Sequence, residues 1–367
     1  MAYYWREMIV RLVQPGDKNN WDAYVRNHPE ASAYHLWAWK DSIIEAYNHK
    51  GYYLVAEKDS QIYGVLPLIH MKLPLLQDQL VALPFCDVGG PLVNSPDIVP
   101  LLLSKAVSLK CSLGARKLEI RSRSLQQTFI TNSATVETDQ RTQSSEKVSM
   151  CLKLPSSSED FWGGFKSKLR SQICKAESNG LTFKWGQLQD ITSFYSVFSK
   201  NMHELGSPVH SKTWFESIIK NYGEEARIGL VFLNDQPVGC GIILICGKSV
   251  SIPWASTIRC FNKLGPNMLL YWSFLKFAAS NKFEIFDFGR STLGTGTYKF
   301  KAQWGAQSVP LHWYTIQANF NGQHVVTYCN SSSSSDCKRQ FLSSMWVKLP
   351  YCLTVFVGSY VRRYISL

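Results

Sequence analysis

The segment from Phe283 to Gly305, FEIFDFGRSTLGTGTYKFKAQWG, contains the residues whose types and spacing are best suited to chemistry. Four of its first six residues, Phe283, Ile285, Phe286 and Phe288, are apolar, and three of these are aromatic. This run predicts a short strand buried on both faces that ends at Gly289. Polar, charged and glycine residues lie in and after this strand: Asp287, Arg290, Ser291, Gly294, Gly296, Thr297 and Tyr298. Because ligands of open α/β sheets bind at the carboxyl ends of strands, we predict a ligand site here.

Lys301, between Phe300 and Trp304, is the strongest candidate for a catalytic residue in this segment. A lysine anchored by two aromatic neighbours would place an ammonium near the strand end, where it could offset a donor phosphate or a developing oxyanion. Asp287 and Arg290 would then orient the loop, and Tyr298 would relay a proton. Each residue also has a purely structural explanation.

Three such alternatives stay open from the residues themselves. Lys301 could be a solvated lysine on a short helix, and Asp287 could pair with Arg290 only to stabilise the end of a strand. Gly294 and Gly296 resemble a phosphate-binding loop, yet they lack the full spacing, and glycine also serves simply to form a turn.

The composition indicates a globular protein with an anionic partner. The chain has 367 residues, of which 45% are hydrophobic, enough for two cores, and its net charge is +12. Such an excess of cations favours phosphorylated substrates, RNA or a membrane surface, without choosing among them. The ten cysteines form no CxxC pair and the chain has no HExxH or GxSxG motif, so we expect neither a metal site nor a hydrolase.

Two halves of the chain repeat one order of elements. DSQIYG at 59–64 corresponds to NDQPVG at 234–239, and ARKLEIRSRS at 115–124 corresponds to NKFEIFDFGRS at 281–291. We therefore predict a duplicated α/β (α+β) unit of helices, antiparallel strands, a helix and a closing strand. The expected ranges are 1–155 and 156–328 for the two copies, 329–338 for a Ser-rich linker and 339–367 for an apolar, basic tail.

Two further regions carry functional hypotheses. The stretch SSSEDFWGGFKSKLRSQICKAESNG predicts one capped helix. It presents Lys166, Lys168, Arg170 and Lys175, either as a solvated face or as an anion-binding patch. The tail either packs back on the body or lies on a membrane surface. No apolar run is long enough to span a bilayer and we read no signal peptide, so a cytoplasmic protein is expected, with peripheral contact at the inner face of the cytoplasmic membrane. His210 is expected at the surface.

Several motifs together resemble the FemAB-like family associated with exosortase (PEP-CTERM) systems, a branch of the GNAT-type acyltransferases. They are WDAYVRNHPEASAYHLWAWK, PFCDVGGPL, HELGSPV, the helix start at 267–272, FDFGRS, and TYKFKAQWG followed by PLHW, in order over about residues 20–315. The resemblance implies two tandem GNAT-like domains, each a mixed, mostly antiparallel sheet flanked by helices, with a BioF2-like acetyltransferase domain. It also implies that Lys301 faces the cleft, and that Trp39, Asn267, Arg170, Arg290, Ser291, Gly294, Gly296 and Trp304 bind substrate.

The activity implied by the resemblance is transfer of an acyl or aminoacyl group to an amine of a cell-envelope or exopolysaccharide precursor. The donor would be acetyl-CoA or another acyl-CoA, or aminoacyl-tRNA, used as a co-substrate, with no bound cofactor and no DNA partner. The acetyl-CoA loop Q/R-x-x-G-x-G/A is not present in clear form. The alternative from a different class is a non-catalytic protein that binds an anionic polymer or a lipid-linked saccharide, for which aromatic and cationic residues would serve equally well.

Overall fold

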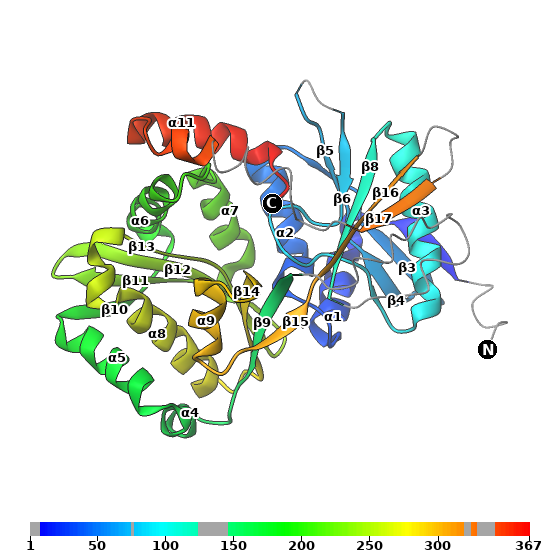
Figure 1. Ribbon diagram of the computed structural model, residues 1–367. Helices are drawn as coiled ribbons and strands as arrows, with labels where there is room; N and C mark the ends of the chain where they lie inside the picture. The colour runs from blue at the N-terminus through cyan, green and yellow to red at the C-terminus, as the bar shows by residue number, and fades with distance from the viewer. Residues whose placement is uncertain (1–7, 75–76, 124–145, 319–323, 329–341) are drawn as a thin grey trace. The chain divides into compact units, whose positions relative to one another are not determined.

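The computed structural model describes residues 8–74, 77–123, 146–318, 324–328 and 342–367, which form two compact units (Figure 1). The first unit contains residues 1–148, 309–331 and 364–367, and the second contains residues 149–308 and 332–363. The expected ranges 1–155 and 156–328 are therefore wrong about residues 309–328. These residues return to the first unit because His312–Ala318 pairs with Lys117–Ser122. The expected Ser-rich linker lies outside the described residues.

The first unit has two sheets around one apolar core. Three antiparallel pairings build the smaller sheet, in the order β1 (Ile9–Leu12), β3 (Leu54–Lys58), β4 (Gln61–Leu66), β7 (Leu92–Val93). The larger sheet has the order β17 (His324–Tyr328), β16 (His312–Ala318), β8 (Lys117–Ser122), β6 (Gln79–Val81), β5 (Ile69–Met71), β2 (Lys50–Gly51), and only β6 and β8 are parallel. Helix α3 (Val99–Ser112) packs Leu102 and Ala106 into the core, and α1 (Lys18–Asn27) and α2 (Trp37–Tyr47) complete the unit.

The second unit has one seven-stranded sheet. Its order is β10 (Leu181–Gly186), β11 (Ala226–Leu233), β12 (Gln236–Cys246), β13 (Ser249–Thr257), β14 (Ile285–Thr292), β9 (Lys147–Lys153), β15 (Gln307–Pro310). The strands from β10 to β13 are antiparallel, and β14 runs parallel to β13. The expected mixed, mostly antiparallel sheet flanked by helices is confirmed.

Helices cover both faces of this second sheet (Figure 1). Helix α8 (Pro266–Ser280) packs Phe274 against Gly229 and Gly241, where an added Cβ would lie within 3 Å of the ring. Neighbouring residues of a strand point to opposite faces, so Trp254, paired with Ile242, lies on the other face, against Phe215 of α7 (Lys212–Tyr222). Helix α6 (Ile191–Glu204) packs beside α7.

The basic helix predicted for the start of the second copy is two helices. They are α4 (Ser158–Gly164) and α5 (Ser167–Ser178), separated at Phe165, whose backbone is extended. Gly163 and Gly164 weaken helix formation at this point, and the ring of Phe165 is buried against Phe161 and Trp272. Burial of this one ring favours the break over a continuous helix.

The critical strand also differs from the expectation. β14 begins at Ile285, whose side chain is exposed, and it continues through Gly289 to Thr292. The predicted strand end at Gly289 is wrong because glycine accepts the positive φ of 72° there and lets the strand kink and continue. In the described part of the chain, no helix combines the length and apolar character required to cross a bilayer.

Candidate functional site

The parallel strands β13 and β14 pair at their starts and then separate. Their paired residues end with Ser251 opposite Asp287, although β13 continues to Thr257 and β14 to Thr292. Beyond this pair, the backbone N–H and C=O groups that face the other strand are not used for pairing with it. An opening between two strands at their carboxyl ends suits an extended ligand with amide groups, which can bind as an added strand does.

Two of the predicted catalytic residues converge on Gly289, just beyond this point. The Oδ1 atom of Asp287 accepts a hydrogen bond from the Gly289 N–H at 2.8 Å. Lys301, on α9 (Gly296–Ala302), donates from Nζ to the Gly289 carbonyl at 3.1 Å and to the Arg290 carbonyl at 2.8 Å. Both side chains are buried, with exposed fractions of 6% and 9%. The alternative that Lys301 is a solvated lysine is therefore wrong, and its contacts with the Gly289 and Arg290 carbonyls position the strand end.

Ser149 and Cys151 of β9 also belong to this cluster, and sequence reasoning missed them. Ser149 donates from Oγ to Asp287 Oδ1 at 2.8 Å, and the Cys151 sulfur lies 3.9 Å from the same oxygen. The signal was present in VSMCLKL, where the two small polar residues alternate with apolar ones and so share one face of a strand.

Trp304, two residues after the end of α9, anchors this helix by packing into an aromatic cluster. Its side chain is 2% exposed and its ring lies 5.7 Å from Phe165, 6.5 Å from Tyr271 and 6.3 Å from Phe300. Trp304 is a predicted substrate contact, but its side chain is almost fully buried in this conformation. Its Nε1 and the Ser291 Oγ are buried without a hydrogen-bond partner in the described structure.

The remaining loop residues lie in or beside the turn between β14 and α9. Thr295 caps the helix by accepting a hydrogen bond from the Tyr298 N–H, and Tyr298 and Arg290 are half-buried. Gly294 and Gly296 are exposed, and an added Cβ would meet no atom within 4 Å at either position. These predicted substrate-binding residues therefore border open space.

The other predicted binding residues lie on separate elements. Asn267 is half-buried in the first turn of α8, which follows the carboxyl end of β13 after a short 3-10 turn. Arg170 is half-buried on α5. Trp39 is fully buried in the first unit and donates from Nε1 to the Pro84 carbonyl, which gives it a structural role.

Lys40, next to Trp39 on α2, is a candidate that the sequence analysis did not single out. Its ammonium lies 3.4 Å from the Trp37 ring centroid, and burial lowers its pKa to about 8. The sequence signal was a lysine within the aromatic run WAWK. A lysine poised near neutral pH is a common feature of functional sites.

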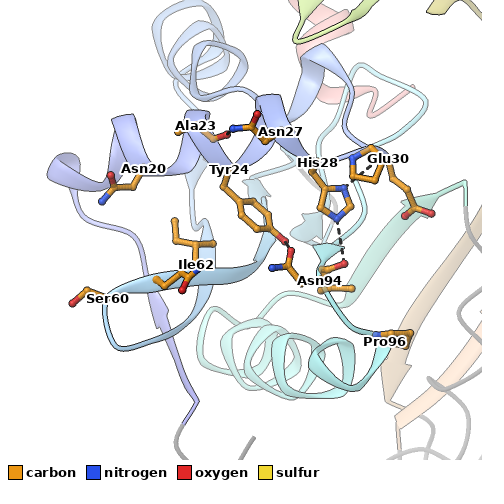
Figure 2. Close-up of a pocket in the computed structure, with 13 residues that line it drawn as sticks. Asn20, Ala23, Tyr24, Asn27, His28, Glu30, Ser60, Ile62, Asn94 and Pro96 are labelled. Atoms are coloured by element: carbon orange, nitrogen blue, oxygen red, sulfur yellow. Dashed lines mark hydrogen bonds between the residues drawn. The ribbon is translucent and has the colours of Figure 1, made fainter. Parts of the chain in front are cut away.

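The first unit also contains a groove of about 910 Å³ between α1 and the β4 and β7 strands (Figure 2). Tyr24 points into it and donates its hydroxyl to Asn94 Oδ1 at 2.9 Å, while burial raises its pKa. His28 donates from Nε2 to the Val93 carbonyl at 3.2 Å, and its Nδ1 accepts from the Glu30 N–H at 3.2 Å. The thirteen lining residues include four amide side chains and one carboxylate, and none of them is Lys or Arg.

The structure bears on the expected position of His210 and on the arrangement of residues that could bind a metal. His210 is buried against Trp214, at 4% exposure, so the expected surface position is wrong, and burial lowers its pKa. Over the described ranges, no group of three His, Cys, Asp or Glu side chains is arranged to hold a metal ion.

Residues 163–302 match the family model described as an acetyltransferase (GNAT) domain. This range includes the β13–β14 opening, Gly289 and Lys301, whereas Ser149 and Cys151 of the same cluster lie before it. The match supports an acyltransferase of the GNAT type.

Solved structures show the same fold over most of the chain. The crystal structure of FemX has a TM-score of 0.66 at 14% identity, covering 83% of this chain and 96% of FemX. A conserved protein of unknown function from Bacteroides thetaiotaomicron VPI-5482 has a TM-score of 0.57 at 8% identity, covering 84% of this chain and 99% of its own. No curated protein sequence matches this chain significantly.

Proposed function

We propose that the protein transfers an acyl group from acyl-CoA to an amine, at the site formed by β13, β14 and α9. The separation of β13 and β14 beyond Ser251 and Asp287 carries this proposal, because it lies within the segment that matches the GNAT acetyltransferase model. The pantetheine arm of coenzyme A is extended and contains two amides, which suits the unused backbone groups of the two strands.

The start of α8 would receive the donor's phosphates. Helix N-termini favour anions, and α8 begins after the carboxyl end of β13, with Asn267 in its first turn and the exposed Lys263 just before it. This placement gives a physical basis for the predicted role of Asn267. It does not require the acetyl-CoA loop that is missing in clear form from the sequence.

The reaction itself needs an uncharged amine and a stabilised oxyanion. The amine nitrogen attacks the thioester carbonyl, a C–N bond forms, and the C–S bond of the tetrahedral intermediate breaks. The proton lost by the amine passes to the departing thiolate, and Tyr298 is the proposed relay. Lys301 and Asp287 contribute by fixing the backbone around Gly289, so that the strand end is held rigid where the thioester would lie.

The acceptor is proposed from the resemblance of motifs. It is an amine of a cell-envelope or exopolysaccharide precursor, with Arg170 of α5 contributing a cation for an anionic group of that precursor. The GNAT match favours a CoA thioester over aminoacyl-tRNA as the donor.

Two labelled donors test the proposal. The purified full-length protein is incubated with envelope extract and either labelled acetyl-CoA or labelled aminoacyl-tRNA, and calorimetry measures CoA binding in parallel. We expect an extractable labelled product from acetyl-CoA that decreases strongly in the Lys301→Ala variant. Label from the tRNA alone, or no CoA binding, would overturn the choice of donor.

A second function, binding of a saccharide without turnover, is favoured by the groove in Figure 2. Its amide side chains and the Tyr24 ring suit a neutral hydroxylated ligand, and the lack of Lys and Arg in its lining disfavours an anionic polymer. Saccharide binding that is lost in Asn94→Ala, together with no labelled product from either donor, would favour this function.

A further inference from the structure

The C-terminal residues 342–363 belong to the second unit, and one side of their helix is packed against it. Helix α11 (Tyr351–Val361) contacts α6 through the hydroxyls of Tyr351 and Ser199, 2.7 Å apart, and through Thr354 Oγ1 and His203 Nδ1, 3.0 Å apart. Gly358 is buried where an added Cβ would lie 3.0 Å from the Val209 backbone. The orientation of the helix is therefore set, and its opposite face is turned outward.

That outward face is apolar. Phe356 is 77% exposed and Leu342 is 65% exposed. Nine of the eighteen large hydrophobic side chains that are exposed in the described chain lie in these 22 residues: Leu342, Met345, Val347, Leu349, Tyr351, Leu353, Phe356, Tyr360 and Val361. A helix packed on a globular unit normally turns its apolar side inward, and a concentrated exposed patch marks an interaction surface.

The charges of this segment are of one sign. It contains Lys348, Arg362 and Arg363 and no Asp or Glu. Arg363 lies over the Tyr360 ring at 4.9 Å, so cation and aromatic ring occupy the same end of the helix. Two copies meeting through this face would bring like charges together, because a two-fold interface places a surface on itself. An anionic surface has the complementary charge.

We propose that residues 342–363 lie flat on an anionic phospholipid surface, with the side chains of Met345 and Phe356 in the interface. Aromatic and aliphatic side chains beside Lys and Arg are the composition of interfacial segments, and the 11 residues of α11 are too short to span a bilayer. This proposal does not depend on the proposed acyl transfer.

The last four residues are not part of this surface, contrary to the tail expected from the sequence. The Ser366 carbonyl accepts from the Phe85 N–H at 2.6 Å and from Arg121 Nη1 at 3.2 Å, so residues 364–367 belong to the first unit. Truncation before the tail would expose α6 and remove these contacts. Point substitutions on the outward face are the better test.

Vesicle flotation with the full-length protein tests the proposal. Vesicles of phosphatidylcholine alone are compared with vesicles that also contain phosphatidylglycerol, for the wild type, Met345→Ser/Phe356→Ser and Lys348→Glu. The control is Leu188→Ser, which removes an exposed leucine at 47% exposure from another part of the second unit. Thermal melts check folding, which these exposed positions should leave unchanged.

We expect wild type and Leu188→Ser to float with the anionic vesicles, and the double variant to lose at least fivefold in partitioning. Lys348→Glu should lose about fivefold or more, since each cation near an anionic surface contributes about that factor. Equal flotation of the double variant and the wild type would overturn the proposal. A dimer in light scattering that Met345→Ser/Phe356→Ser dissociates would overturn it as well, in favour of self-association.

Discussion

Asp287 and Lys301 hold the same residue from its two sides: Asp287 binds the N–H of Gly289, and Lys301 binds its C=O. The two side chains come from different elements, β14 and α9, so this shared partner couples the helix to the strand end. Gly289 has a positive φ, which makes the backbone between these contacts a defined kink. The kink lies just beyond the last paired residues of β13 and β14.

Lys301→Ala should reduce acyl transfer by up to about 10²–10³-fold, the cost of removing one oxyanion-hole donor, because the strand end that it positions lies where the thioester would bind. Lys301→Arg should recover part of the rate, because a guanidinium can donate to two carbonyls but has a different shape. Steady-state kinetics with Lys299→Ala as the control measures this, since Lys299 is exposed on the same helix. Equal and mild effects of the two alanine variants would exclude a role for Lys301.

Asp287→Asn separates hydrogen bonding from charge. The amide oxygen can still accept from Gly289 N–H and Ser149 Oγ, so a positioning role predicts a rate within about tenfold of the wild type. Asp287→Ala should lose much more, because it removes the acceptor of both the half-buried Gly289 N–H and the buried Ser149 hydroxyl. If Asn is as damaging as Ala while both variants fold, the carboxylate acts as a base instead.

Gly289→Ala should destabilise the protein by about 1–2 kcal/mol, because alanine is strained at a φ of 72°. Gly296→Ala is the matched control, since its added Cβ meets open space. Chemical denaturation measures the free energy of unfolding of both variants. A Gly289→Ala protein as stable as the control would show that the kink is not required.

Burial lowers the pKa of His35 to about 4, while its ring nitrogens bond Gly90 O and the Ser32 backbone. The unfolded chain therefore binds a proton near the ordinary value of about 6.5 that the folded chain does not, and stability increases with pH between these values. Neutral, buried His35 makes its full contribution to the free energy of unfolding above about pH 6.5. This contribution, at most about 3 kcal/mol, is lost as the pH falls toward 4. Denaturation of His35→Gln from pH 4 to 7 should show a shallower dependence; an unchanged slope would contradict this.

Lys40 should be acetylated faster than Lys50 at pH 8, because burial lowers the pKa of Lys40 to about 8 and leaves more of it uncharged. Limited acetylation followed by peptide mass spectrometry measures this against the exposed Lys50 of the same unit. Trp37→Leu removes the ring beneath the ammonium and should change the rate at Lys40 only. Equal labelling of Lys40 and Lys50 would contradict the expectation.

Local patterns predicted most elements but not where distant elements meet. Turn residues at 58–60 predict a hairpin and apolar periodicity predicts a helix over 97–113, and the structure has β3–β4 and α3 at these places. Such patterns succeed because they depend only on neighbours in sequence. The pairing of β16 with β8 depends on a partner about 190 residues away, which no local pattern encodes. The contacts of Lys301 likewise depend on the kink at Gly289. From the sequence alone, this glycine predicts the end of a strand and gives no sign of a kink within it.

The return of residues 309–318 and 324–328 to the first unit has a consequence for synthesis of the chain. As the protein leaves the ribosome, β8 emerges long before β16, and one edge of β8 stays unpaired over about 190 further residues. At roughly 5–20 residues per second, that interval lasts on the order of 10–40 s. An unpaired strand edge exposes backbone N–H and C=O groups that can pair with other chains. We therefore expect the newborn chain to be most prone to aggregation while its second unit is being made.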